Sequence, residues 1–336
     1  MDKLRCCICL AVFVSGAITA LAQAIESGPE LKVVAFGSCN RQDKAQPLWN
    51  PILEAKPDLF IWTGDIVYGD TEDMALLKEK YRLQAEQADY MVFTRKVPVI
   101  GVYDDHDYGV NDGGKEYPQR EASAQLLLDF LGESKESPRR KQEGVYASYD
   151  YGEADRLVRV IMLDTRYHRE KPGPEADILG EAQWKWLESQ LMGSPARVNL
   201  IVSSIQILPE QHRFEKWANF PKARERLFDL IAKSKARGVV MISGDRHIAE
   251  ISRMDVPGVF YPIYEITSSG MTHSFSSFRG EPNNLRVGEP FTELHYGLIA
   301  FDWDAVIPTI SMEIRDAANK AVRSLRFPLG EIGTGN

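Results

Sequence analysis

The chain has 336 residues, of which 44% are hydrophobic and 26% are charged, so it can bury a core and is not disordered throughout. Its formal net charge of −8 argues against a general nucleic-acid-binding protein, because such proteins concentrate lysine and arginine to neutralise phosphates. A small phosphorylated substrate stays compatible with this charge, since a metal ion can supply positive charge locally. No long apolar stretch follows the N-terminal region, which argues against a polytopic membrane protein.

The N-terminal segment predicts a secretory signal peptide over residues 1–24. Two basic residues precede an uncharged run from Cys6 to Leu21, and small residues follow at Ala22–Ala24. These are the charged start, apolar core and cleavage site of a signal peptide. A membrane anchor is the alternative, but a run of 16 residues is shorter than the roughly 20 that a span needs. We therefore expect residues 25–336 to form a secreted or periplasmic protein without a stable membrane span.

Short β-rich runs alternate with longer helical patterns along the first two thirds of the mature chain. The predicted strands are Leu31–Phe36, Asp58–Thr63, Val97–Tyr103, Val158–Leu163, Val198–Ser203 and Val239–Ile242. The predicted helices are Asp73–Ala88, Glu121–Leu131, Glu181–Leu191 and Lys222–Lys235. Nearly continuous apolar strands separated by helices are typical of an α/β sheet that is covered on its faces. Three later strands without long helices between them predict a second, more antiparallel sheet packed on the first: Val259–Ile266, Leu298–Trp303 and Thr309–Ile314. We expect one catalytic domain.

Polar side chains gather where these predicted strands end. The crevice at the carboxyl ends of the strands is where α/β sheets bind ligands. Five strands deliver carboxylates, imidazoles, an amide and a thiol to this edge, which is the inventory of a metal site: Cys39, Asn40, Asp65, Tyr68, Asp104–Asp107, Asn111, Asp164–Arg166 and Asp245–His247. Adjacent acids such as Asp104 and Asp105 repel one another unless a cation compensates. Arg166 has two interpretations, a surface ion pair or a clamp on a phosphate.

Cys39 is the one cysteine that remains after the expected cleavage. In an oxidising compartment an unpaired thiol is unusual, and two interpretations stay open: an apolar filler of the core, or a thiolate bound to a metal. The whole set suits hydrolysis at phosphorus on a metal pair, in which the ions acidify a water and neutralise the phosphoryl oxygens. Asp65, just past a tight glycine turn, can bridge two ions. His106 can protonate the departing oxygen.

In order and spacing, several segments resemble the alkaline phosphatase D (PhoD-like) group of metallophosphatases. The similarity extends over most of the mature chain and rests on the blocks Phe36–Cys39, Gly64–Tyr68, Asp104–Asp107, Leu163–Arg166, Gln183–Leu187, Trp217–Leu227, Ser243–His247, Tyr296–Ile299 and Asp302–Trp303. The resemblance implies a four-layer αββα sandwich in a single domain. It also implies a phosphomonoesterase or phosphodiesterase that depends on iron and calcium.

By the same resemblance, particular residues receive roles at the metal centre. Cys39 and Tyr68 would bind iron, since thiolate and phenolate suit ferric iron, and Asp65 would bridge the two metals. The calcium side would be completed by Asn111, Asp245 and His247. The catalytic candidates are His106, Arg166 and Asp105.

The chain departs from the family pattern in the acidic segment. Many relatives have Asp-Asp-His-Glu followed by an Asn-Asn pair, whereas here the fourth residue is Asp107 and the pair is Asn111–Asp112. The calcium ligand could therefore be Asn111, Asp105 or Asp112, and we rank them in that order.

Two other functions compete with this hypothesis. A serine-type lipase or esterase would use Ser38, Ser204 or Ser269 near strand ends, but the sequence contains no Gly-x-Ser-x-Gly motif. A relative that binds a phosphate-containing ligand without catalysis is the other alternative. For the phosphoesterase, the expected partner is a small-molecule phosphate ester, for example a phospholipid or a nucleotide. The Ser-rich loop with His273 and Phe275–Phe278 is a candidate lid.

Overall fold

The computed structural model describes residues 27–333 of the chain. The predicted signal peptide, residues 1–24, lies outside these residues. Among the helices of residues 27–333, none is long and apolar enough to cross a membrane.

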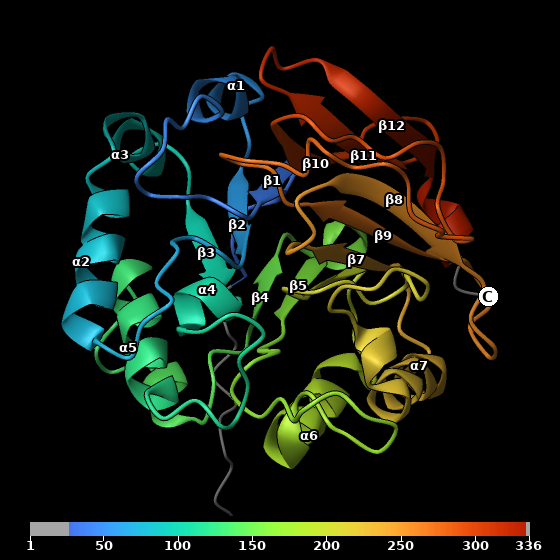
Figure 1. Cartoon of the computed structure of the whole chain (residues 1–336). Coiled ribbons are helices and arrows are strands. Elements are labelled where there is room, and N and C mark those ends of the chain that lie inside the picture. The colour runs from blue at the N-terminus through green and yellow to red at the C-terminus, as the bar shows by residue number, and fades with distance from the viewer. Residues whose placement is uncertain (1–26, 334–336) are drawn as a thin grey trace, which may run out of the picture.

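Two six-stranded sheets form the centre of the molecule (Figure 1). The first has the order β12-β11-β10-β1-β2-β3, and its strands are β1 (Val33–Gly37), β2 (Leu59–Thr63), β3 (Val99–Val102), β10 (His295–Asp302), β11 (Thr309–Asp316) and β12 (Ala321–Pro328). The second has the order β4-β5-β6-β7-β9-β8, and its strands are β4 (Ala147–Tyr151), β5 (Val158–Met162), β6 (Val198–Val202), β7 (Val239–Ser243), β8 (Ala249–Met254) and β9 (Ile263–Ser268).

Each sheet combines a parallel group of strands with antiparallel edges. In the first sheet β1, β2 and β3 are parallel, and β10 pairs antiparallel with β1 in the register Val33 to Ala300. In the second sheet β5, β6, β7 and β9 are parallel, while β4 and β8 pair antiparallel at the two edges. The parallel strands therefore end together at one edge of each sheet.

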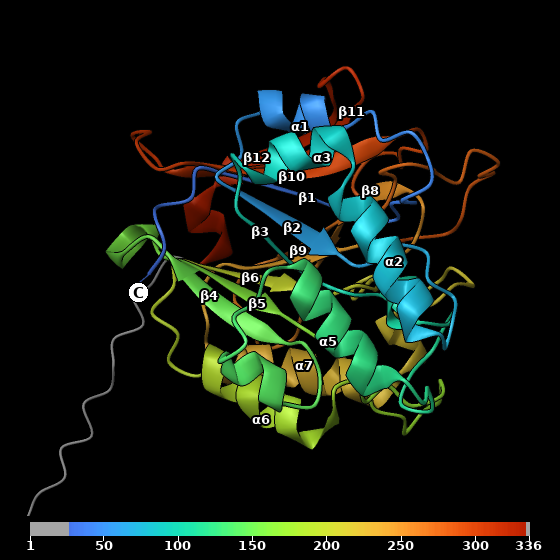
Figure 2. The same ribbon diagram turned by 90° about the vertical axis from the view of Figure 1, so that its left-hand side faces the viewer.

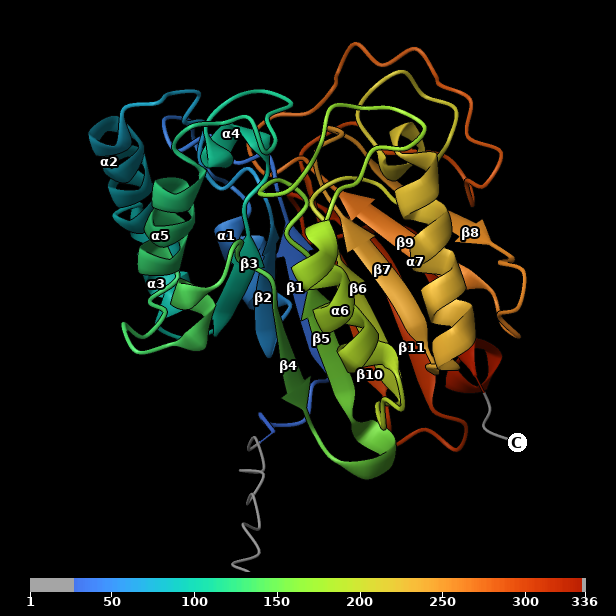
Figure 3. The same ribbon diagram turned by 90° about the horizontal axis from the view of Figure 1, so that it is seen from below.

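Helices cover the outer face of each sheet, and the two sheets pack against one another (Figure 2). The first sheet is covered by α1 (Trp49–Glu54), α2 (Met74–Ala85), α3 (Ala88–Thr94) and α5 (Arg120–Phe130). The second is covered by α6 (Gly180–Leu191) and α7 (Pro221–Ser234), which lie in front of β5, β6 and β7 in Figure 3. The expected four-layer αββα sandwich is confirmed.

The buried side chains form two clusters, one on each face of the second sheet. A large cluster of buried side chains from both sheets fills the space between them and continues under the helices of the first sheet. A second cluster joins the outer face of β5, β6 and β7 to α6 and α7, and it includes Trp217 and Phe220. These two aromatics are fully buried, so their role is packing. Such burial of apolar area is the main stabilising contribution to the fold.

The sheet membership of the strands differs from the sequence-based expectation. The prediction placed the six early strands in one sheet and the late strands in another. Instead β1, β2 and β3 share a sheet with the late strands β10, β11 and β12, and β9 continues the sheet of β7. Strands that are buried on both faces have no alternating pattern, so their sequences do not specify which neighbour they pair with. The prediction also missed three strands, β4, β8 and β12, and the short helices α1, α3 and α4 (Asp105–Tyr108).

Candidate metal centre

The first turn of the site follows β1 and carries Cys39. This residue has φ 57°, and the N–H of the next residue, Asn40, donates to the Asp65 carbonyl at 2.8 Å. The thiol is fully buried, with Sγ 3.4 Å from Asp65 Oδ2. Burial and the nearby carboxylate raise the pKa of the thiol well above its ordinary value. Without a cation, the site therefore favours the protonated thiol over the thiolate. A bound cation would favour the thiolate instead.

The second turn follows β2 and carries Asp65. Gly64 has φ 97°, and a Cβ at this position would lie 2.4 Å from the Cβ of Asp104, so only glycine lets the two turns touch. The Asp107 carboxylate holds both turns: it accepts N–H bonds from Asp65 at 3.1 Å, from Ile66 at 3.0 Å and from Asp104 at 2.7 Å. Asp107 thus organises the backbone of the site.

Backbone strain is concentrated at these strand ends. Ten residues other than glycine have positive φ within residues 27–333. One is Asp112, an alternative calcium ligand, and four belong to the ligand set that the family resemblance implies: Cys39, Asp65, Asp245 and His247. Side chains with a Cβ rarely adopt this conformation, which costs of order 1 kcal/mol or more per residue. The surrounding structure holds these four residues in unfavourable conformations that aim their side chains at one place.

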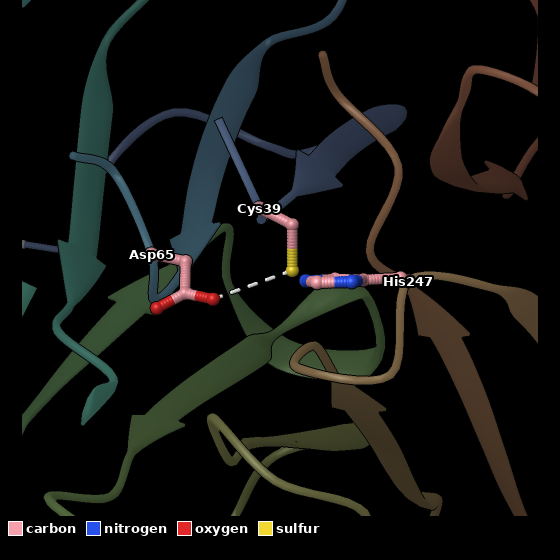
Figure 4. A group of neighbouring side chains, drawn as sticks. All are labelled: Cys39, Asp65 and His247. Carbon is pink, nitrogen blue, oxygen red and sulfur yellow. Dashed lines mark hydrogen bonds between the residues drawn. The ribbon is translucent and has the colours of Figure 1, made fainter. Parts of the chain in front are cut away.

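Three of these side chains form the first ligand group. The donor atoms of Cys39, Asp65 and His247 lie within 4.8 Å of one another and come from three separate turns (Figure 4). Tyr68 joins them: its Oη lies 3.3 Å from Asp65 Oδ2 and 3.1 Å from His247 Nε2. This combination of sulfur, phenol oxygen, carboxylate and imidazole is what a transition metal prefers.

The second ligand group consists mainly of carboxylates. One set of donor atoms within 4.8 Å belongs to Asp104, Asp105 and Asp245, and another belongs to Asp65, Asp105 and His106. Asp65 therefore occurs in both groups, as expected for a bridging residue, and Asp105 links the two sets. Hard oxygen donors of this kind suit calcium or magnesium.

Two features of these side chains fit bound cations: buried oxygens without a hydrogen-bond donor, and several acids close together. Asp65 Oδ1 and Asp104 Oδ2 are buried and accept no hydrogen bond. Burial, followed by repulsion from the neighbouring acids, raises the pKa of Asp65 and of Asp245 well above the usual range. Buried acceptors without donors and acids that destabilise one another are unfavourable in isolation, and a metal ion removes both costs.

His106, the imidazole of the second ligand group, also lines the wall of the cavity. Its Nδ1 is 2.7 Å from Asp70 Oδ1, and its ring stacks on Tyr68 with a centroid distance of 4.1 Å. Burial opposes the charged form, but the hydrogen bond to Asp70 and the charge of Asp105 outweigh it, so the pKa of His106 is raised. The imidazole can therefore hold a proton near the reacting centre.

Arg166 is placed underneath the site. It is fully buried, its Nε donates to Asp104 Oδ1 at 2.7 Å, and its Nη2 pairs with Glu215 at 2.5 Å. The remaining Nη1 lies 3.3 Å from the Gly113 carbonyl. Arg166 is thus buried against Asp104, Glu215 and the Gly113 carbonyl, and its side chain has no exposed surface.

The residues that compete for the calcium role occupy different positions. Asp105 is buried, and its Oδ2 accepts the N–H of Asp112 at 2.8 Å. Asn111 and Asp112 are exposed and line the mouth of the site. The structure brings Asp105 into the ligand groups described above, and a further group of donor atoms within 4.8 Å of one another belongs to Asp105, Asp112 and Glu215. Asn111 lines the cavity wall.

A cavity of about 520 Å³ opens over the metal centre. Its walls bring together side chains from five segments of the chain: Asp105, His106, Asn111, Asp112, Arg169, Pro172, Arg213, Phe214, Glu215, Asn219, Asp245, Arg246, His247 and Phe275. A volume of this size accommodates a small organic molecule. The site is thus a metal-type donor cluster at the base of a ligand-sized cavity.

A family model for PhoD-like phosphatases matches residues 34–282, which is more than half of the chain and includes every candidate ligand. The chain belongs to the PhoD-like phosphatase family. A curated relative, alkaline phosphatase D of Bacillus subtilis, is 22% identical over 276 residues, with 66% of this chain and 47% of the relative aligned. The present chain therefore spans about half the length of that PhoD-like relative.

Solved structures support the PhoD-like fold. A structure of PhoD superposes with a TM-score of 0.68 and 17% identity, over 90% of this chain and 69% of the other. A dimetal phosphatase from Danio rerio gives a TM-score of 0.55 and 12% identity, over 89% of this chain and 99% of the other. GAP50, the anchor in the inner membrane complex of Plasmodium, superposes with a TM-score of 0.60 and 13% identity, over 89% of each chain. At these identities the likeness concerns the fold.

Sequence reasoning did not assign several residues that meet at this PhoD-like site. His273 was placed only in the candidate lid loop, and its Nε2 lies 3.0 Å from Tyr68 Oη. Asp70 and Glu215 were not considered, although they pair with His106 and Arg166. Asp70 has positive φ just beyond a recognised block, which no sequence pattern reveals. Glu215 lies in an irregular loop before η3 (Trp217–Asn219), far from any strand end.

The serine candidates take part in other interactions. Ser204 Oγ donates to Asp104 Oδ1 at 2.5 Å, and Ser269 Oγ bonds to the backbone of Ile248. Ser38 Oγ lies 3.5 Å from Cys39 Sγ. Within residues 27–333 none of these three hydroxyls hydrogen-bonds to a histidine, so the nucleophile–base pair of a serine hydrolase is not formed here.

Proposed function

We propose that this protein is an exported, metal-dependent phosphoesterase that hydrolyses small-molecule phosphate esters in the cavity over the metal centre. The observation that carries the proposal is the sharing of Asp65 between a thiol-containing ligand group and a carboxylate group. A side chain common to two donor sets is what a two-metal phosphoesterase requires. The match to the PhoD-like family model supports the same activity.

The two donor groups support different ions. Cys39, Tyr68, Asp65 and His247 would hold iron, because thiolate, phenolate and imidazole are its preferred ligands. Asp105, Asp245 and the second oxygen of Asp65 would hold calcium, with Asn111 as an added ligand at the mouth. His247 is grouped with the thiol rather than with the calcium side that the family resemblance implied.

Bound ions of this kind lower the pKa of a water molecule and neutralise the phosphoryl oxygens. The residues of the chain do the rest. His106 would donate its proton to the departing alkoxide from the cavity wall, and Asp70 keeps the imidazole oriented through its 2.7 Å contact. Arg166 would act as a positioning residue that fixes Asp104 beneath the site.

Both monoesters and diesters are compatible with this arrangement, since each presents one phosphoryl group to the ions. The cavity of about 520 Å³ exceeds what a phosphate alone fills, so nucleotides and phospholipid headgroups are candidate substrates. Phe275 lines the cavity from the loop that was considered as a lid. It would contact the alcohol portion of the ester.

The test uses protein of measured metal content and a panel of aryl phosphate mono- and diesters, nucleotides and phospholipids. We expect hydrolysis that a chelator abolishes and that Asp65→Asn lowers at least about a thousandfold, because loss of metal contacts costs about 4 kcal/mol in the transition state. Asp229→Asn, an exposed acid on α7, is the matched control and should keep full activity.

Three results would contradict this account. Full activity of an iron-free, colourless preparation would remove the iron assignment. Unchanged turnover by Asp65→Asn would remove the shared metal centre. Binding of phosphate esters without hydrolysis of any of them would favour the non-catalytic alternative, and resistance to chelators with sensitivity to a serine-directed phosphonate would favour the serine hydrolase.

A further inference from the structure

The lining of the cavity over the metal centre includes basic side chains as well as acids. Three arginines line it: Arg169, Arg213 and Arg246. Two of them are already neutralised, since Arg169 pairs with Glu215 and Arg246 pairs with Glu281. The third arginine of the cavity lining has no such acidic partner among residues 27–333.

Arg213 is that third arginine. Its side chain is exposed to the cavity, and its guanidinium makes neither a hydrogen bond nor an ion pair with any residue of the described range 27–333. A guanidinium carries five N–H donors in a planar fork that matches a carboxylate or phosphate. A ligand in the cavity can therefore use all of them.

An aromatic platform holds this guanidinium in place. The Cζ of Arg213 lies 5.0 Å from the centroid of the Phe214 ring, and the Cζ of Arg246 lies 4.4 Å from the same centroid. Phe275 packs edge-on against Phe214 at 6.0 Å. Cation–π contacts restrict the long arginine side chain, so less conformational entropy is lost when it binds an anion.

The loop that carries Arg213 is also tied to the loop across from it. Gln211 Oε1 accepts the N–H of Asn284 at 3.0 Å, and Arg246 reaches Glu281 in the same segment. The platform is thus built from two loops that support one another at the cavity rim. Such support is what a binding residue on a loop needs in order to keep its position.

The acidic residues of the lining restrict where a second anion can lie. Asp105, Asp245 and the exposed Asp112 line the side of the metal centre, and with bound ions this side takes the phosphoryl group. Asp112 would repel any further negative charge placed near it. The cavity has room beyond one phosphate, and the direction toward Arg213 is the one with an unpaired cation.

We propose that Arg213 binds a second anionic group on the alcohol portion of the substrate, so that the preferred substrates are phosphate esters bearing a carboxylate or another phosphate. This inference rests on the proposed phosphoesterase function, because it takes the scissile phosphate to lie at the metal centre. It defines Arg213 as a specificity-determining residue of the same cavity.

The experiment compares Arg213→Gln with wild-type metal-loaded protein on two matched substrate pairs. The first pair is 3-phosphoglycerate and glycerol-3-phosphate, and the second is 6-phosphogluconate and sorbitol-6-phosphate. Within each pair only a carboxylate replaces a CH₂OH group, and the two pairs differ in the distance from that group to the phosphate. Arg95→Gln is the control variant, because Arg95 is exposed at the C-terminal cap of α3 and has no ion pair among residues 27–333.

We expect wild type to prefer the carboxylated member of at least one pair. Arg213→Gln should lower kcat/KM for that member about tenfold and for its neutral partner less than about twofold, since a charge-assisted hydrogen bond is lost only in the former. For the carboxylated member, the kcat/KM of Arg213→Lys should lie between those of wild type and Arg213→Gln, because lysine keeps the positive charge but lacks the planar fork of donors. Arg95→Gln should match wild type throughout.

Two outcomes would overturn the inference. An equal loss on both members of each pair would mean that Arg213 contacts the transferred phosphoryl group, and no loss on either member would mean that it contacts no part of the substrate. If wild type hydrolyses no phosphate ester, the proposed function fails separately. Calorimetry with uncleavable phosphonate analogues of the same pairs then decides the inference, and equal affinity of wild type for both members would overturn it.

Discussion

The two halves of the metal centre differ in chemistry and in access. The half around Cys39 is buried and mixed, with a thiol, a phenol and an imidazole besides the Asp65 carboxylate. The half around Asp105 and Asp245 consists of oxygen donors and opens into the cavity. In the proposed function, the first half would retain a buried ion, and the second would hold an ion that also faces the substrate.

The pKa shifts set Asp105 apart from the other candidate ligands. Burial and neighbouring acids raise the pKa of Cys39 and of Asp65, so these groups ionise readily only beside a cation. For Asp105 burial also opposes ionisation, but the charges of Arg166 and His106 outweigh it and the pKa is lowered. The arginine beneath the site thus favours the anionic form of Asp105, whereas Asp245 in the same half has a raised pKa and, like Cys39 and Asp65, needs a cation in order to ionise readily.

The largest effect is expected from Asp65, the one ligand common to both halves. Asp65→Asn should lower kcat at least about a thousandfold and reduce the content of both metals, because a neutral amide cannot bridge two cations. Elemental analysis of the purified variant measures this alongside activity. Loss of only one metal would show that Asp65 belongs to a single half.

A smaller and more selective effect is expected from Cys39. Cys39→Ser should remove iron and the visible charge-transfer absorption while calcium is retained, and activity should fall about a hundredfold, a loss of about 3 kcal/mol. The measurement is an absorption spectrum with metal analysis of the same sample. Retention of colour and iron by this variant would contradict the division of ligands between the halves.

The oxygen half is tested by comparing two neighbours. Asp105→Asn should weaken calcium binding about tenfold or more, whereas Asn111→Ala should change it only about twofold, because Asp105 is buried among the ligands and Asn111 is exposed at the mouth. Calcium titration of metal-stripped protein measures both constants. The opposite ranking would restore Asn111 as the main ligand.

The smallest effect concerns a buried acid outside the centre. Burial raises the pKa of Glu265 from 4.5 to about 6, although its carboxylate accepts N–H bonds from Ile207 and Leu208. Because the folded pKa is the higher one, the proton stabilises the fold below pH 4.5, and about 2 kcal/mol is lost as the pH rises past 6. Glu265→Gln should abolish this slope in urea unfolding, with or without metal.

The exposed Glu225 on α7 supplies the control for that measurement, since Glu225→Gln should keep the wild-type pH slope. A Glu265→Gln variant whose stability still falls between pH 4.5 and pH 6 by the wild-type amount would show that another group is responsible. A slope that changes on metal loading would place Glu265 within the influence of the metal centre, contrary to its position on β9.

Most of the secondary structure and most of the candidate ligands could be predicted from the sequence. The strand before Asp65 and the strand before Asp245 are short apolar runs that end in glycine and a polar residue, a local pattern that is visible without a fold. Such patterns locate donors at the carboxyl ends of strands. The burial of Arg166 and the pairing of His106 with Asp70 could not be predicted in this way, because each joins segments that are far apart in the chain.

The sequence by itself determined the donor chemistry: a lone thiol, acids and imidazoles placed directly after apolar strands. Only the tertiary structure decided how they are shared, because β1 pairs with β10 and the two sheets pack face to face, and this brings the turn of Cys39 to the turn of His247. Local patterns record which residues leave a strand. Which turns meet across the interface between two sheets depends on packing between elements more than 200 residues apart, and that information is spread over the whole core.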